Sequence, residues 1–68
     1  MKLQLVTWRD SHFRLDGGVP RDYLMKTAGW TRRKGRWLLI YSELTGEGIH
    51  RATTAVPIEN VVKRKTLR

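Results

Sequence analysis

The stretch that decides the fold is RRKGRWLLIYSELTGEGI, residues 32–49, because it places one apolar segment between two turn signals. A Lys-Gly pair separates the apolar segments 23–33 and 36–44, which predicts a β-hairpin. Residues 45–48, Thr-Gly-Glu-Gly, form a second turn signal, and a further strand follows over residues 49–56. Three consecutive strands joined by short turns indicate an antiparallel sheet.

The remainder of the chain adds two more strands. Residues 2–9 alternate apolar and polar side chains, as a strand does, whereas residues 10–22 are rich in Gly, Pro and Asp and indicate a loop. Residues 57–60, Pro-Ile-Glu-Asn, resemble a single helical turn, and residues 61–67 form a strongly basic last strand. We therefore expect one all-β domain over residues 1–68, a five-stranded barrel with one short helical turn before the last strand.

Two local patterns carry a resemblance to Src-homology-three (SH3-like) barrels. GRWLLIYSELTG, residues 35–46, has the spacing of the third strand and distal turn of signalling members, and VPIENVV, residues 56–62, resembles their Ile-Pro-x-x-Tyr-Val signature. The resemblance implies the SH3-like barrel. Trp37 matches the tryptophan of their peptide groove, but Asn60 stands where the groove tyrosine would be. This departure argues against binding of proline-rich peptides.

The N-terminal stretch is similar to a second group of proteins. Val6, Trp8, Asp10 and Ser11 follow the pattern Val-x-Trp-x-Asp-Ser, which opens many short proteins encoded by bacteriophages and prophages. This likeness implies a phage context and assigns no chemistry.

Charge is the strongest functional signal in the composition. Fourteen Lys and Arg against six acids give a net charge of +8. Such a balance favours an anionic partner, namely nucleic acid, an acidic protein face or a lipid surface, although the same charge also serves solubility alone. We expect no membrane span, because no stretch approaches about 20 apolar residues.

The chain offers no metal or cofactor site. It contains no cysteine, and its two histidines, His12 and His50, stand far apart in the sequence. Both are expected to be structural, at the surface or half-buried. Absence of cysteine fits a reducing compartment, and we expect a cytoplasmic protein.

Alternation along the hairpin sorts its side chains into two faces. We expect Arg32 opposite Trp37, Trp30 opposite Leu39 and Arg33 opposite Arg36. One face then holds Trp30, Arg32, Trp37, Leu39 and Tyr41, and the other holds Thr31, Arg33, Arg36, Leu38 and Ile40. Either face can be the core. If Leu38 and Ile40 are inside, the tryptophan face becomes an exposed apolar patch.

Cations beside aromatic rings suit nucleic acid, because bases stack on rings while cations follow phosphates. The candidate phosphate contacts are Arg32, Arg33, Lys34 and Arg36 at the hairpin tip, and Lys63, Arg64 and Lys65 in the last strand. Trp37, with Trp30 or Tyr41, is the candidate stacking platform. The pattern does not decide whether the ligand is a single strand or the groove of a duplex. The structural alternative for the hairpin tip is a solvated turn. For the last strand it is an edge strand whose charges block aggregation.

Catalysis finds no support in the residue pattern. The acids are scattered. His12 follows Ser11 directly, and even on a strand successive residues point apart, so the two cannot form a nucleophile pair. We expect a non-enzymatic basic module, without cofactor or small-molecule substrate, that binds DNA or RNA. The alternative is a protein-interaction module, for example a phage-encoded regulator that docks on a host protein or pairs with itself.

Overall fold

The computed structural model describes residues 1–12 and 21–68, which form one antiparallel sheet of five strands. In chain order the elements are β1 (Lys2–His12), β2 (Arg21–Lys34), β3 (Trp37–Leu44), β4 (His50–Pro57), the single 3-10 turn η1 (Ile58–Asn60) and β5 (Val61–Thr66). The predicted all-β class is confirmed, and so is the helical turn before the last strand. Within the described ranges no helix is long and apolar enough to cross a membrane.

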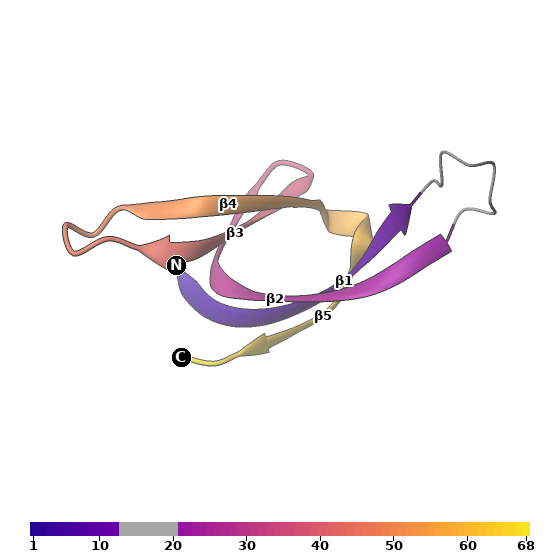
Figure 1. Ribbon diagram of the computed structural model, residues 1–68, viewed down its shortest axis with the longest axis horizontal. Helices are drawn as coiled ribbons and strands as arrows, with labels where there is room; N and C mark the ends of the chain where they lie inside the picture. Colours follow the sequence, from indigo (N-terminus) through magenta and orange to yellow (C-terminus); the bar gives the residue numbers. More distant parts are fainter. Residues whose placement is uncertain (13–20) are drawn as a thin grey trace.

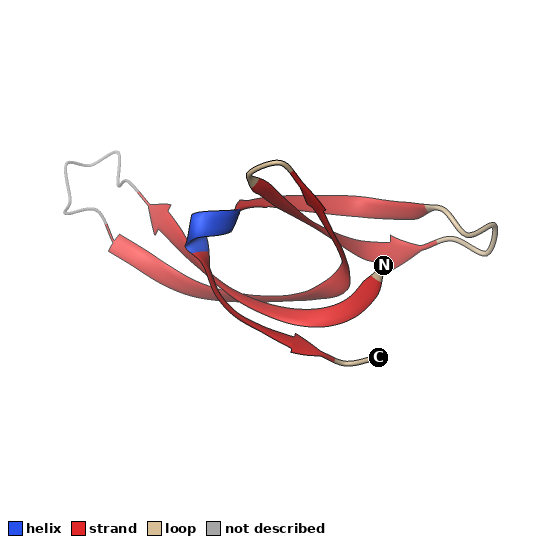
Figure 2. Ribbon diagram, turned by 180° about the vertical axis from the view of Figure 1, so that it is seen from behind, coloured by secondary structure: helices blue, strands red, loops and turns tan. Residues whose placement is uncertain are grey.

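The sheet is strongly curled but it is not closed. Its strand order is β4-β3-β2-β1-β5, so β4 and β5 are its two edges. Figure 1 shows these edges above and below the interior, and Figure 2 shows η1 leading from one to the other. No hydrogen-bonded pairing joins β4 to β5. The expected barrel closure is therefore not confirmed.

The longest strand, β2, belongs to both halves of the sheet. Its residues 21–31 pair with β1, and its residues 30–34 pair with β3. Gly29 lies where β3 leaves this pairing. A Cβ atom at Gly29 would stand 2.5 Å from the Tyr41 carbonyl oxygen and 2.8 Å from Ile40 Cγ2. The close crossing of β3 over β2 thus requires a residue without a side chain.

A very small apolar core lies inside the curl. Its fully buried members are Val6, Leu38, Ile40 and Val56, and the partly buried Trp8, Ile58 and Val61 pack against them. Leu38 and Ile40 are therefore inside. This result decides between the two hairpin orientations left open by the sequence, because the tryptophan face must then lie on the outside of the sheet.

One polar network extends the core across three strands. Thr31 Oγ1 donates a hydrogen bond to Gln4 Oε1 at 2.8 Å, and Gln4 Nε2 donates to Thr66 Oγ1 at 3.2 Å. Gln4 and Thr31 are both buried. Since the described side chains contain no buried polar atom without a partner, this network is satisfied and links β2, β1 and β5.

The loop predicted over residues 10–22 is partly wrong. β1 continues to His12 and β2 begins at Arg21, and these two residues face each other at the end of the pairing. Asp has a low preference for strands, but a complete backbone ladder between two adjacent strands overrides it here. The Gly17-Gly18 turn signal lies outside the described residues.

Candidate nucleic-acid interface

The β2–β3 hairpin is closed by a two-residue turn, Gly35-Arg36, and not by Lys34-Gly35 as expected. Gly35 adopts a φ of 59°, the left-handed conformation that tight hairpin turns require. Because the turn lies one residue farther along the chain than expected, each residue of the hairpin faces a different partner. Lys34 faces Trp37, Arg32 faces Leu39 and Trp30 faces Tyr41. The predicted pairs of Arg32 with Trp37 and of Trp30 with Leu39 are therefore wrong, although these residues do share one face.

The corrected register also removes the expected pair of like charges. Arg33 faces Leu38, not Arg36, and its Nε donates a hydrogen bond to the Gly35 carbonyl at 3.0 Å. Arg36 lies in the turn itself. Lys34 moves to the tryptophan face, because it is the cross-strand partner of Trp37. The outer face of the hairpin thus gains a lysine directly beside its most exposed aromatic ring.

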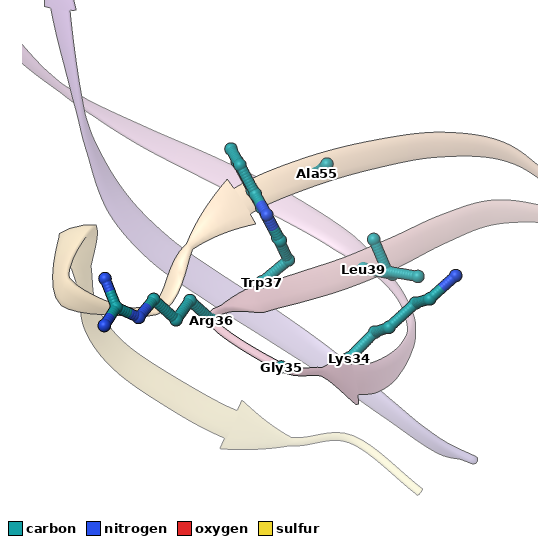
Figure 3. A pocket seen from close by; sticks show the side chains of 6 residues that line it. All are labelled: Lys34, Gly35, Arg36, Trp37, Leu39 and Ala55. Carbon is teal, nitrogen blue, oxygen red and sulfur yellow. The ribbon is translucent and has the colours of Figure 1, made fainter.

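An open pocket of about 540 Å³ surrounds Trp37. It is lined by Lys34, Gly35, Arg36, Trp37, Leu39 and Ala55. The Trp37 side chain is 49% exposed and forms one wall, beside Leu39 and Ala55. In Figure 3 the charged ends of Lys34 and Arg36 extend to opposite sides of the indole. The pocket therefore combines an accessible aromatic ring and an apolar floor with a cation on each side.

The hairpin tip is anchored and is not a free finger. Trp37, the first residue of β3, pairs with Pro57 of β4, so the sheet is three strands wide almost up to the turn. The Ile58 amide of η1 donates a hydrogen bond to the Arg36 carbonyl at 2.8 Å. These two contacts fix the turn, and with it the pocket, on the body of the domain.

Trp30 and Tyr41 are less available than Trp37. They face each other across the β2–β3 ladder and both are half-buried. The His50 ring lies against both, with centroids 5.5 Å from Trp30 and 5.8 Å from Tyr41. His50 is half-buried, which agrees with its expected place at the surface or half-buried. Because an imidazole already contacts these two rings, Trp37 is the more accessible stacking platform.

The basic residues of the last strand form a separate cluster. Lys63, Arg64 and Lys65 are exposed on β5, and Lys63 and Lys65 face Thr7 and Leu5 of β1. In the sheet order, β1 and β2 stand between β5 and β3. The structure therefore brings Lys34, Arg36 and Trp37 together in one pocket and places the β5 cations on another strand.

No carboxylate of the described residues forms an ion pair with the cations of the β2–β3 hairpin. In the parts of the chain that the structure describes, the one ion pair joins Arg51 Nη2 and Glu43 Oε1 at 3.1 Å, and none involves Arg32, Lys34 or Arg36. A group of three or more potential metal ligands is also absent from the described residues.

One residue that lines the pocket, Ala55, is not predicted from the sequence. Ala55 comes from β4 and reaches the pocket because it faces Leu39 across the β3–β4 ladder. A small apolar residue carries no local sign of such a role, so only the register of that ladder finds it.

The chain was also compared with known proteins. No protein-family model matches it, and no match was found among curated proteins or among solved structures.

Proposed function

We propose that this protein is a non-enzymatic module that binds nucleic acid through the outer face of the β2–β3 hairpin. One observation carries the proposal: the exposed Trp37 ring lines the same pocket as Lys34 and Arg36, and no carboxylate of the described residues forms an ion pair with either cation. An aromatic ring flanked by unpaired cations suits a polyanion whose monomers carry flat bases.

The spacing of the cations supports this function. Arg32 and Lys34 are two residues apart on one face of β2, which separates their backbone positions by about 7 Å. This is close to the separation of successive phosphates along an extended nucleic-acid strand. The cations can therefore follow a phosphate chain while the neighbouring ring contacts a base. Lys63, Arg64 and Lys65 on β5 would supply additional phosphate contacts for a longer ligand.

The proposal includes the SH3-like assignment of the fold. The strand order and the single helical turn before β5 support it, with a sheet that curls but leaves its edges open. An experimental structure in which β4 and β5 lie far apart would contradict this assignment.

Binding is tested by fluorescence anisotropy at low salt with labelled single-stranded and duplex probes. We expect wild-type protein to bind, and we expect a variant with Arg32, Lys34 and Arg36 replaced by serine to bind more weakly. A matched control replaces Lys2, Arg9 and Lys26, three exposed cations outside the pocket, and loses the same charge. Absence of binding to every probe, or equal weakening by both variants, would refute the proposal.

A second candidate function, self-association, rests on the open edge of β4. The β5 edge carries three consecutive cations, which oppose pairing with another strand. β4 has Arg51 as its one Lys or Arg, and this side chain is paired with Glu43. Two copies of β4 would form one continuous antiparallel sheet. Light scattering would then show a dimer, and Thr53→Lys, which adds a charge to this exposed edge position, would return it to a monomer.

A further inference from the structure

We infer that the Trp37 pocket accepts one unpaired base, so that the ligand is single-stranded nucleic acid and not a duplex. This inference rests on the proposed function and narrows its ligand class. It follows from three features of the hairpin: the accessibility of the ring, the apolar floor beside it, and the attachment of the turn to the rest of the domain.

The ring and the floor suit the flat face of a base. Trp37 is half exposed, and the pocket beside it is lined by the apolar side chains of Leu39 and Ala55. Its volume of about 540 Å³ lies within the range of roughly 300–1,000 Å³ found for small-molecule sites. In a duplex both faces of an internal base are covered by neighbouring bases, and exposing one costs a few kcal/mol. A single strand offers these faces without that cost.

The position of the cations suits a strand that passes across the ring. Lys34 and Arg36 extend to opposite sides of the indole (Figure 3). A nucleotide stacked on Trp37 would therefore have one cation near the phosphate that precedes it and another near the phosphate that follows. Arg32 lies farther along the same face of β2 and extends this track toward Leu39.

The attachment of the hairpin turn to the rest of the domain disfavours insertion of the hairpin into a duplex groove. A two-stranded ribbon fits the major groove, which is about 12 Å wide. Here β4 pairs with β3 as far as Trp37, and the Ile58 amide holds the turn at the Arg36 carbonyl. The tip is thus part of a three-stranded sheet backed by η1. Such a tip offers a surface on which an extended nucleic-acid strand can lie. It is not a free two-stranded ribbon that could enter a groove.

The test measures how well three unlabelled competitors displace the labelled probe from wild type, Trp37→Ala and Trp37→Tyr. The competitors are an oligothymidylate, an oligouridylate and a DNA duplex of equal length. We expect wild type to bind a single strand at least about 5-fold more tightly than the duplex. Loss of one base–ring stack in Trp37→Ala should weaken single-strand binding by about 5- to 150-fold. Trp37→Tyr retains a ring and should stay within about 5-fold of wild type.

Leu44→Ala is the matched control, because Leu44 is a similarly exposed apolar residue of β3 outside the pocket. It should bind like wild type, and circular dichroism should show all four proteins folded. Loss of affinity for either the DNA or the RNA strand in Trp37→Ala supports the inference. Equal binding of duplex and single strands with no effect of Trp37→Ala would overturn it and leave the proposed function standing. Failure of wild type to bind any probe would overturn both.

Discussion

Replacing Gly29 by alanine tests the feature on which the position of the hairpin depends, the close crossing of β3 over β2. The added Cβ would lie 2.5 Å from the Tyr41 carbonyl oxygen, 2.8 Å from Ile40 Cγ2 and 2.9 Å from the Tyr41 carbonyl carbon. Two of these atoms are backbone atoms of a paired strand, which cannot rotate away. The substitution must therefore separate β3 from β2 or distort the ladder near Trp30.

The expected cost follows from these contacts. Overpacking of a closely packed site costs about 1–3 kcal/mol, and contacts with backbone place Gly29→Ala at the upper end. Alanine recovers about 0.5–1 kcal/mol, because it restricts the unfolded chain more than glycine does. The net loss is about 2 kcal/mol. In a domain of this size that lowers Tm by about 8–16 °C.

The assay is thermal unfolding followed by circular dichroism, with Gly46→Ala as the matched control. A Cβ at Gly46 meets no heavy atom within 4 Å, and its backbone is not left-handed. Gly46→Ala should therefore melt at or slightly above the wild-type Tm. If Gly29→Ala melts within about 3 °C of wild type, the crossing does not need glycine and the reasoning fails.

Three further substitutions test the core, the buried polar network and the surface ion pair. Ile40→Ala truncates one of the four fully buried apolar side chains of the described residues, and urea unfolding should show a loss of about 2–5 kcal/mol. Thr31→Val takes the hydroxyl donor from buried Gln4 Oε1 and should cost about 1–3 kcal/mol, whereas an unchanged urea midpoint would show that this bond contributes nothing. Glu43→Gln removes the carboxylate that pairs with the exposed Arg51 and should change stability by less than about 1 kcal/mol, so a larger loss would contradict its surface character.

The sequence predicts the strands well because the strand signals are local. Alternation and glycine-containing turns place β3, β4 and β5 to within about two residues of their observed bounds. The end of the first strand is missed for the opposite reason. Residues 10–12 lack strand preference, and they continue β1 because β2 supplies a partner along its whole length.

Cross-strand register is the part of the site that residue patterns leave undetermined. Shifting the turn by one residue, from Lys34-Gly35 to Gly35-Arg36, keeps the hairpin but changes each facing pair. Lys34 then replaces Arg32 as the partner of Trp37. Which face is buried depends on long-range packing of Leu38 and Ile40 against Val6 and Val56, which no pattern within the hairpin specifies.

The most direct test of the central claim is the salt dependence of single-strand affinity. Each phosphate neutralised on a single strand contributes a slope of about −0.7 to the plot of log K against log salt. Replacing Arg32, Lys34 and Arg36 together should therefore flatten the slope by about 2. Replacing Lys2, Arg9 and Lys26 should leave it unchanged. Equal slopes for wild type and the hairpin variant would contradict the claim that these cations contact phosphates.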